Sequence, residues 1–291
     1  MIDLRPEQLE LAIVIPVFNR WHFTHACLES LRAQTDQRFY TIVVDDGSTD
    51  ETLPTLQADY PEVQVLQTPG DVFWTGTVNL GITAAMGQGA ARVMTLNNDV
   101  VCTPQFVAEM LKGSTEKPQA LLGALALEGD LAQPKIAYAG DTWNWLTDGR
   151  HPIAAAYRRP LQGLHEVSHF PGRGLLIPRA CIEKAGLFDA VRFPHYMADY
   201  DYTMVARRAG FRVFVNYDAP ILTYPDASGD RSIRAGRSWG NYIKHLTDIR
   251  GGANLANFYK YALKNCPPLL LPFHLLAGTA KRLAGFWLRP A

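Results

Sequence analysis

The stretch VVDDGSTDET, residues 43–52, contains the pattern on which the fold prediction depends. An apolar run ends there in two carboxylates, a glycine and a helix N-cap residue, either Ser48 or Asp50. This order predicts a buried strand, a tight turn and a helix. An acidic loop that caps its helix is the plainest interpretation, but two adjacent acids, Asp45 and Asp46, are more than one cap requires.

Strands and helices are expected to alternate along the first hundred residues. The expected strands are 11–18, 40–46, 63–68 and 92–99, and the expected helices are 21–34, 50–59 and 75–88. Because the strands are continuously apolar, we predict an α/β fold with a mostly parallel open sheet covered by helices on both faces. Ligands of such sheets bind beyond the carboxyl ends of the strands. The polar residues at those ends are Asn19 and Arg20, Asp45 and Asp46, and Asn97 to Asp99.

After about residue 118 the pattern predicts a mixed half of strands and loops. Strands are expected at 120–127, 134–139 and 167–177, and a helix at 199–209 that ends at Gly210 and precedes the strand FRVFV. We therefore divide the chain into a domain and a C-terminal helical extension. Their bounds are 1–228, with halves 10–118 and 119–228, and 229–291.

Composition excludes several classes of protein. The 28 basic residues balance 28 acidic ones, so no overall field attracts nucleic acid. The cysteines lack CxxC spacing, which fits thiols in a reducing compartment better than a zinc site or disulfides; they are Cys27, Cys102, Cys181 and Cys266. The N-terminal segment places acids and a proline where a signal peptide has basic residues, so we expect a cytoplasmic protein.

The polar strand ends suggest nucleotide and metal chemistry of a particular kind. No GxGxxG follows the first strand and GxxxxGK[ST] is absent, so dinucleotide and P-loop chemistry are unsupported. A carboxylate such as Asp46 can accept hydrogen bonds from a nucleobase or a ribose. Asp99 can ligate Mg²⁺ or Mn²⁺ when substrate phosphates and water complete the coordination. The plainer interpretation, that Asn98 or Asp99 caps a helix near Pro104, has an awkward geometry.

Asp199 and Asp201 begin the expected helix that carries Arg207 and Arg208 near its end. Side chains two positions apart on a helix point roughly 200° apart, so both acids cannot face one cleft. We expect one acid to be functional and the other to be solvated. Acids in the first turn also stabilise a helix through its dipole, and this plainer explanation stays open.

Six segments, in this order and at these separations, resemble the family-2 inverting glycosyltransferases of the GT-A fold. They are IVIPVFNR (13–20), VVDDGSTDET (43–52), TGTVNLGI (75–82), LNNDV (96–100), GRGLLIPRACIEKAGLFDAVRF (172–193) and ADYDYTMVARRAGF (198–211). The resemblance covers about residues 10–225. It implies transfer of a sugar from a nucleotide-diphosphate sugar, such as a UDP- or dTDP-sugar, to a saccharide or lipid-linked saccharide acceptor. DVFWTGTVNLGI (71–82) is most similar to rhamnosyltransferase-like members from surface-polysaccharide clusters.

The resemblance also implies roles for individual residues. Asp199 would be the general base, and Asp99 would hold the divalent metal, because Asn97–Asn98–Asp99 stands in the place of the family's DxD motif. Asp46 would contact the base of the nucleotide, and Arg207 would orient Asp199 or approach a phosphate. The implied nucleotide- and donor-binding residues are Pro16, Asn19, Arg20, Asp46, Asn79, Asn97, Asn98 and Arg207, with Gly81 beside the donor and Gly172 to Gly174 near the acceptor.

Two departures from the family pattern leave alternatives open. Asn97 replaces the first acid of the DxD, so we expect weak binding of free metal. Many members also have a histidine after the last core strand, where this chain reads APILTYPDASGDRS (219–232) and Asp226 could substitute. A catalytically silent nucleotide-sugar-binding or scaffold protein is the alternative function. A sugar-1-phosphate nucleotidyltransferase is disfavoured because PVFNRWHF (16–23) has no glycine for a triphosphate loop.

The C-terminal extension is basic, aromatic and apolar. Residues 265–280 lack a fully charged side chain but contain three prolines and are shorter than the roughly 20 residues of a spanning helix. One interpretation is peripheral contact with the inner face of the membrane, through apolar residues such as Trp287 and basic residues such as Lys281. The other is a helical hairpin packed on the domain or in a homodimer. Trp74, Trp143 and Trp145 could stack on a sugar or base, although burial in the core explains them equally well.

Overall fold

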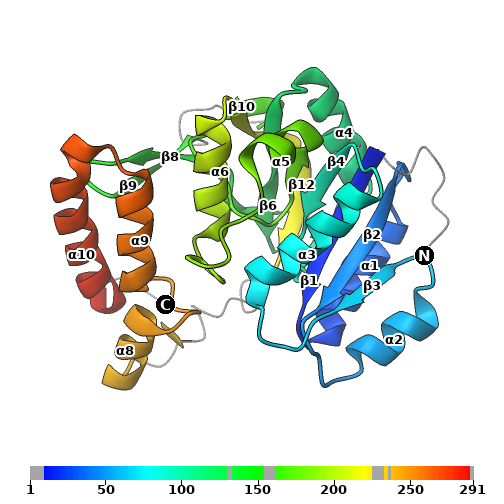
Figure 1. The fold of residues 1–291 in the computed structure, drawn as a ribbon, viewed down its shortest axis with the longest axis horizontal. Helices are drawn as coiled ribbons and strands as arrows, with labels where there is room; N and C mark the ends of the chain where they lie inside the picture. Colours follow the sequence, from blue (N-terminus) through cyan, green and yellow to red (C-terminus); the bar gives the residue numbers. More distant parts are fainter. Residues whose placement is uncertain (1–9, 130–132, 154–160, 225–232, 235–236, 289–291) are drawn as a thin grey trace.

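The computed structural model describes residues 10–129, 133–153, 161–224, 233–234 and 237–288, and a ten-stranded sheet forms its centre (Figure 1). The strand order is β10-β12-β6-β11-β4-β1-β2-β3, with β5 paired to β12 and β7 to β6. Helices cover both faces of this sheet, and the C-terminal helices lie to one side of it.

The first half is a parallel α/β unit, as expected. Strands β4, β1, β2 and β3 lie side by side and all pair in parallel. Its strands are β1 (Leu11–Val17), β2 (Phe39–Asp45), β3 (Gln64–Gln67) and β4 (Arg92–Thr95), and its helices are α1 (Trp21–Arg32), α2 (Thr52–Asp59) and α3 (Phe73–Gly87). The expected strand 92–99 is too long, because the chain turns after Thr95 and carries Asn97 to Asp99 away from the sheet.

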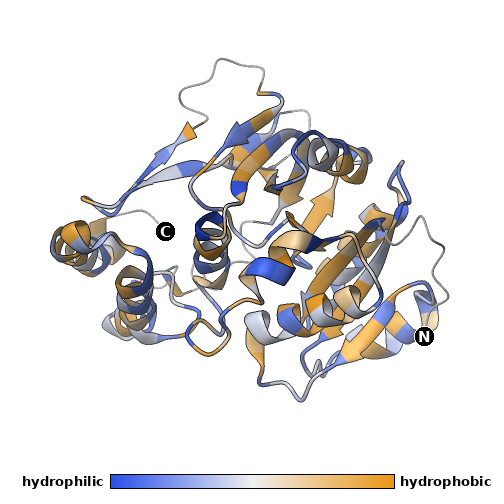
Figure 2. Cartoon of the chain, turned by 45° about the horizontal axis from the view of Figure 1, so that its top comes forward, coloured by the Kyte–Doolittle hydropathy of each residue, from blue (hydrophilic) through white to orange (hydrophobic). Residues whose placement is uncertain are grey.

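The continuous apolarity of the strands follows from two cores, one on each face of the sheet. Ala12 and Val14 of β1 pack with α3 and α6 on one face, and Ile13 and Ile15 pack with α1 and α4 on the other. Side chains alternate along a strand, so a strand buried on both faces needs apolar residues at every position. Figure 2 shows the strands of the first half mostly in hydrophobic colours.

The second half is mixed, as expected. Strand β11 runs antiparallel to both β4 and β6, whereas β12 runs parallel to β6. Its elements are β5 (Val100–Cys102), α4 (Phe106–Glu116), β6 (Ala120–Glu128), β7 (Lys135–Tyr138), β8 (Asp141–Asn144), β9 (Gly149–Pro152), β10 (Leu164–Glu166), β11 (Leu175–Pro178), α5 (Arg179–Ala185), α6 (Ala198–Arg208) and β12 (Arg212–Thr223).

The expected strand 167–177 is wrong. Only its end belongs to β11, because Gly172 and Gly174 lie against other side chains and carry the backbone past α6 before the strand starts. At Gly172 a β-carbon would lie 2.4 Å from Trp74 Cζ2. The loop that replaces the strand reaches the start of α6, and this contact shapes the candidate site.

The C-terminal extension consists of α8 (Trp239–Thr247), α9 (Leu255–Asn265), the short 3-10 helix η4 (Pro268–Leu270) and α10 (Leu271–Leu288). Helix α9 packs on α6, and α10 packs on α9 and the loop after β8. The aromatic rings of Trp143, Trp145 and Tyr261 stack together at this junction, with centroids 5.2 to 5.9 Å apart. None of the described helices combines the length and the apolarity that crossing a membrane requires.

Candidate active site

The loops after β1 and β2 are joined through Asn19. Its Oδ1 accepts hydrogen bonds from the backbone N–H groups of Thr49 (2.7 Å) and Asp50 (3.3 Å), and its own N–H donates to Ser48 Oγ (2.7 Å). Both Asn19 and Arg20 have positive φ, 55° and 63°. Such conformations are held only where the surroundings fix them. Asn19 therefore sets the shape of the rim where a nucleotide is expected.

Asp46 is buried and fixes the start of α3. Its carboxylate accepts hydrogen bonds from Thr68 Oγ1 (2.6 Å) and the Phe73 N–H (3.0 Å). An anion at a helix N-terminus satisfies N–H groups that have no partner within the helix. Beside it, a β-carbon at Gly47 would lie 2.9 Å from Gly70 Cα, so the two loops touch. A contact between Asp46 and a nucleotide base stays a prediction.

The segment Asn97–Asn98–Asp99 divides its three side chains among three tasks. Asn97 Oδ1 accepts a hydrogen bond from Trp74 Nε1 (3.1 Å), and Asn98 is buried and donates to Thr24 Oγ1 (3.0 Å). Asp99 is half-buried, and its carboxylate has no hydrogen-bond or ion-pair partner among the described residues. The two amides thus anchor the turn and leave the carboxylate available to a ligand.

These residues fit a metal held by one protein carboxylate. The described ranges contain no group of three or more histidine, cysteine, aspartate or glutamate side chains arranged to hold an ion. Mg²⁺ and Mn²⁺ sites of nucleotide enzymes commonly use one or two carboxylates and complete their coordination with substrate phosphates and water. Asp99 meets that need, and Asn97 Oδ1 is already engaged by Trp74.

Asp199 lies at the start of α6 with its carboxylate held by two backbone donors. The Gly172 N–H donates to Oδ2 (2.9 Å) and the Tyr200 N–H to Oδ1 (2.9 Å). Burial raises the pKa of Asp199 above its ordinary value, although these hydrogen bonds and the charge of Arg173 oppose that shift. The residue as a whole is half-buried. A carboxylate with a raised pKa suits proton abstraction.

A chain of contacts connects Asp199 to the metal-binding candidate. The Trp74 indole fills the space in front of Gly172 and donates its N–H to Asn97, while Thr95 Oγ1 donates to the Gly172 carbonyl (2.5 Å). The two ends of the candidate site are therefore held together by packed groups from β4, α3 and the loop before β11. Trp74 holds the neighbouring groups in place. In the sequence, only its indole side chain marked it as a candidate, and nothing there predicted this contact.

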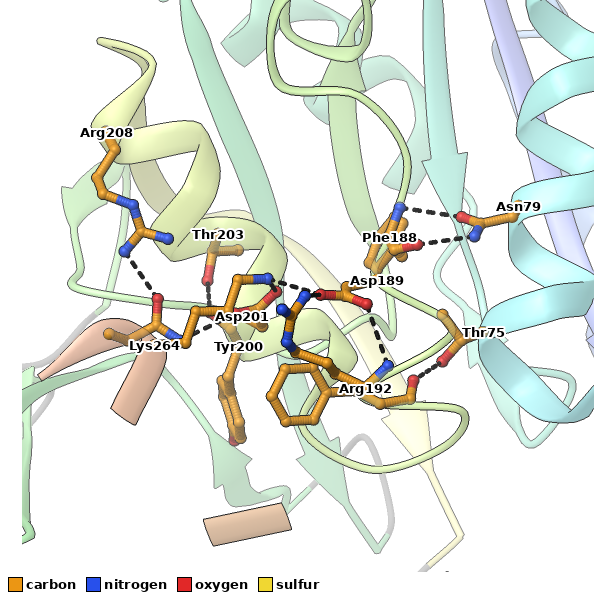
Figure 3. A network of polar contacts seen from close by, with 12 residues as sticks. Thr75, Asn79, Phe188, Asp189, Arg192, Tyr200, Asp201, Thr203, Arg208 and Lys264 are labelled. Atoms are coloured by element: carbon orange, nitrogen blue, oxygen red, sulfur yellow. Dashed lines mark hydrogen bonds and ion pairs between the residues drawn. The ribbon is translucent and has the colours of Figure 1, made fainter. Parts of the chain in front are cut away.

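Asp201 is not solvated, which corrects the expectation for the second acid of α6. Only 1% of the residue is exposed, and its carboxylate accepts hydrogen bonds from Lys264 Nζ (2.7 Å) and Asn265 Nδ2 (2.9 Å). Lys264 Nζ also contacts Asp189 Oδ2 (3.0 Å), which pairs with Arg192 (Figure 3). As expected, the two acids face different ways, but Asp201 binds the C-terminal extension to α6.

Two other predicted site residues contact backbone groups. Arg207 Nη1 donates to the Val167 (3.2 Å) and Ser168 (3.0 Å) carbonyls, two helical turns beyond Asp199. Asn79 exchanges two hydrogen bonds with the Phe188 backbone, 2.8 and 3.0 Å long (Figure 3). Both hold loops beside the site.

The remaining predicted residues divide between the sheet and its rim. Pro16 pairs with Val44 inside the sheet, and a β-carbon at Gly81 would lie 2.3 Å from Val14 Cγ1. The Arg20 guanidinium lies over the ring of Phe23, 5.5 Å from its centroid. Asp226 lies outside the described residues.

Comparisons with known proteins agree with this architecture. The family model "Glycosyl transferase family 2" matches residues 12–161. An uncharacterized protein of Mycobacterium tuberculosis is 28% identical over 218 residues, covering 73% of each chain. The N-acetylglucosaminyl-diphospho-decaprenol L-rhamnosyltransferase of the same organism is 28% identical over 229 residues, covering 70% of this chain and 72% of its own.

Solved structures are similar in fold at low sequence identity. GalNAc-T7 with UDP, GalNAc and Mn²⁺ superposes with a TM-score of 0.62 at 13% identity, and 97% of this chain spans 56% of that one. Residues 1–349 of TarS from S. aureus give 0.54 at 15% identity, with coverage of 94% and 81%. The expected GT-A architecture, a parallel α/β half joined to a mixed half, is confirmed. Because the family model spans more than half of the sequence, this chain belongs to glycosyl transferase family 2.

Proposed function

We propose that the protein transfers a glycosyl group, with inversion, from a nucleotide-diphosphate sugar to a hydroxyl of a saccharide or lipid-linked saccharide acceptor. The observation that carries this proposal is the Asp199 carboxylate, which burial makes more basic and two backbone N–H groups hold in place. Its connection through Gly172, Trp74 and Asn97 to the unpartnered carboxylate of Asp99 supports a donor and a base in one site.

Asp199 takes the proton of the attacking acceptor hydroxyl. The acceptor oxygen forms the new bond to the anomeric carbon as the bond from that carbon to the diphosphate oxygen breaks, so one displacement inverts the configuration. The nucleoside diphosphate leaves with the bonding electron pair and needs no proton at the moment of departure. The Gly172 and Tyr200 N–H groups keep the Asp199 oxygens aimed during this exchange.

On the donor side, Asp99 is the residue that would hold Mg²⁺ or Mn²⁺ together with the donor diphosphate. When bound, the metal supplies positive charge that stabilises the leaving group. Asn97 holds Trp74, and Asn98 holds the turn against α1, so that both amides position Asp99. The Mn²⁺ and UDP of the GalNAc-T7 structure support a nucleotide donor with a divalent metal.

The acceptor class rests on the relatives. The rhamnosyltransferase that resembles this chain is named for an acceptor that carries a sugar, a diphosphate and a polyprenol. A further relative is the putative glycosyltransferase EpsH of Bacillus subtilis, 28% identical over 194 residues. These names support transfer of a hexosyl or rhamnosyl group in polysaccharide or O-antigen-type synthesis.

The C-terminal extension supports peripheral contact with an anionic membrane surface at the cytoplasmic side. Apolar side chains spaced three, four or seven residues apart form an exposed stripe along η4 and α10. Its large members, with exposed fractions, are Leu269 (89%), Phe273 (57%), Leu276 (75%), Leu283 (42%) and Trp287 (37%). Residues 229–291 contain ten basic and two acidic side chains, a net charge of +8, so residues 1–228 carry −8.

This charge favours a membrane as the occupant of the stripe over a second copy of the chain. Two extensions of the same strong positive charge repel each other, whereas anionic headgroups attract them by about 1 kcal/mol per basic residue near the surface. Apolar side chains such as Phe273 and Trp287 then enter the interface. A homodimer through the stripe is the other outcome of the test described in the Discussion.

Replacing the base tests the proposed reaction. Asp199→Asn keeps the shape of the side chain and one of the two oxygens that accept hydrogen bonds from backbone N–H groups, but it cannot take a proton. Transfer is therefore expected to fall at least about a hundredfold. Binding of UDP or dTDP, measured by calorimetry with Mn²⁺, is expected to stay within a factor of about two. Full activity of this variant would remove Asp199 as the base. Donor binding without transfer or hydrolysis by the natural chain would favour the silent alternative.

A further inference from the structure

Asp99 and Tyr224 leave the same end of a strand pair. Strand β5 pairs antiparallel with β12, and the last two residues paired in this ladder are Val100 and Thr223. Asp99 directly precedes β5, and Tyr224 directly follows β12. The fold therefore brings a tyrosine to the carboxylate that is the metal-binding candidate, although the two are far apart in sequence.

The first turn of α1 holds both sides of this strand end. The Phe23 ring lies 4.9 Å from the Tyr224 ring, between centroids, at an interplanar angle of 47°. The next residue, Thr24, accepts a hydrogen bond from the Asn98 side chain (3.0 Å), and α1 packs on β5. Two consecutive residues of one helix thus contact Tyr224 and the residue before Asp99. This second set of contacts also places Tyr224 beside the turn that carries Asp99.

The Tyr224 hydroxyl is available to a ligand. Tyr224 is 40% exposed, and within the described part of the chain no hydrogen bond engages its hydroxyl. By contrast, the hydroxyls of Tyr60, Tyr138 and Tyr259 each form a hydrogen bond with another side chain. A tyrosine whose ring packs on Phe23 while its O–H has no partner can donate that hydrogen to a bound molecule.

A donor diphosphate at Asp99 needs a group that the carboxylate cannot supply. An ionised carboxylate offers only acceptor oxygens, so Asp99 can hold phosphate oxygens only through a cation. The charged oxygens that the cation leaves uncovered require N–H or O–H donors. A hydroxyl that donates to an ionised oxygen forms a short and strong hydrogen bond. Tyr224 carries such a hydroxyl at the strand end that also presents Asp99.

We propose that Tyr224 is a donor-binding residue whose hydroxyl donates a hydrogen bond to the diphosphate of the nucleotide sugar. This inference rests on the proposed glycosyl transfer and adds a residue to its donor site. The diphosphate is then held from both strands of the β5–β12 pair, through a cation at Asp99 and directly at Tyr224. Phe23 is a positioning residue, because it contacts the Tyr224 ring.

Tyr224→Phe tests the proposal, because it removes the hydroxyl and keeps the ring. The full chain is titrated by calorimetry with UDP and dTDP, and the diphosphate that binds more tightly is compared with its own nucleoside, uridine or thymidine. Affinity for the diphosphate is expected to fall about tenfold in the variant, since a hydrogen bond to a charged group is lost. Affinity for the nucleoside should stay within a factor of about two. The loss should occur both with and without Mn²⁺, because the hydrogen bond does not involve the ion.

Two further variants separate the hydroxyl from the ring and from general effects. Tyr259→Phe is the matched control, because Tyr259 is 37% exposed on α9 and its hydroxyl bonds to Thr279 (2.9 Å). It is expected to bind the diphosphate as the natural chain does. Tyr224→Leu removes the hydroxyl and the ring, so it should lose at least as much affinity as Tyr224→Phe. Thermal unfolding of each variant checks that it is folded.

The outcomes separate this inference from the proposed function. If Tyr224→Phe binds the diphosphate as tightly as the natural chain, the role of the hydroxyl is overturned and glycosyl transfer still stands. An equal loss of nucleoside affinity would place the contact on the nucleoside, and a loss seen only with Mn²⁺ would place it on the ion. Either result also overturns the proposal. If the natural chain binds no nucleoside diphosphate, the proposed function itself fails.

Discussion

The N–H of Gly172 donates a 2.9 Å hydrogen bond to Asp199 Oδ2, and position 172 has no room for a side chain. A methyl group there would meet Trp74 at 2.4 Å and Asp199 Cβ at 3.6 Å. The base is therefore aimed by a residue whose only contribution is its backbone. Moving that backbone by a few tenths of an ångström misdirects the carboxylate.

Gly172→Ala is expected to lower kcat by about a hundredfold, because small displacements of reacting groups have such effects. Affinity for the nucleoside diphosphate should fall less than kcat, because Gly172 binds Asp199 directly but reaches Asp99 only through Trp74 and Asn97. The measurements are transfer rates and calorimetric titration. Gly87→Ala is the matched control, because a β-carbon at Gly87 meets nothing within 4 Å. Equal rates for the two variants would contradict the aiming role.

The pH dependence of transfer is expected to show the raised pKa of Asp199. Burial raises this pKa, so the carboxyl stays protonated to a higher pH than an ordinary aspartate, and activity falls as pH decreases through that value. The acid limb of kcat/KM against pH reports it. An acid limb with its midpoint below pH about 4, the ordinary pKa of an aspartate, would contradict the raised pKa of Asp199.

The same shift predicts that Asp199→Asn gains stability relative to the natural chain as pH rises, in addition to a pH-independent cost where the amide nitrogen faces a backbone N–H. A carboxyl with a raised pKa in the folded state favours unfolding once the pH exceeds the ordinary value, because the unfolded chain releases its proton first. The gain in free energy of unfolding for the variant should therefore increase as pH rises from the ordinary to the raised pKa and then level off. Urea unfolding at several pH values measures it, and a gain that is constant with pH would contradict it.

Asp99→Ala is expected to abolish the stimulation of nucleoside diphosphate binding by Mn²⁺, because this carboxylate is unpartnered and available to the ion. Asn97→Asp adds a charge while keeping an acceptor for Trp74 Nε1, so it should tighten Mn²⁺ binding roughly tenfold. Calorimetry with UDP or dTDP, with and without Mn²⁺, measures both. Unchanged Mn²⁺ dependence in Asp99→Ala would exclude Asp99 as the ligand.

Lys264→Met is expected to lower the free energy of unfolding by about 1–3 kcal/mol, because it leaves the buried Asp201 carboxylate without its cation. Asn265 still donates to Asp201, so the loss stays below that of a fully unpaired charge. Lys112→Met is the control, since Lys112 is 69% exposed and its surface pair with Glu109 contributes little to stability. Denaturant unfolding compares them, and equal losses would contradict the role of Lys264.

Phe273→Glu together with Leu276→Glu is expected to lower binding to anionic vesicles at least about tenfold, because charges then lie on the exposed stripe. Ile136→Glu, which charges an apolar residue exposed to 38% on β7, should have no effect. Co-sedimentation with vesicles of phosphatidylglycerol and phosphatidylcholine measures this. A concentration-dependent dimer that the stripe variant abolishes, without vesicle binding, would identify a homodimer interface instead.

The fold was predictable wherever one physical signal dominated. Apolar runs such as 11–17 and 39–45 are buried on both faces of the sheet, and their apolar composition predicts that burial. The strand prediction failed at residues 167–174 because the apolar residues of this segment pack on α6 while its glycines approach Trp74 and Ala124. These are contacts between distant parts of the chain, and the local sequence pattern contains no information on them.

The roles of the candidate site residues stay predictions. Asp99 and Asp199 follow from residue type, position and resemblance, and the structure connects Asp199 through Gly172 and Trp74 to Asn97, two residues before Asp99. The burial of Asp201 was not predictable, since its partner Lys264 lies 63 positions further along in sequence.

The junction of Trp143, Trp145 and Tyr261 has a consequence for how the molecule unfolds. The buried His274 ring on α10 lies 5.1 Å from Trp145, and Arg282 binds Asp148. Because Tyr261 belongs to α9, both α9 and α10 share side-chain contacts with the second half of the domain. We expect such contacts to join residues on the two sides of the predicted boundary at 228 in one cooperative unfolding step. Amide protons of α9 and those of β6 should then exchange with solvent at the same free energy.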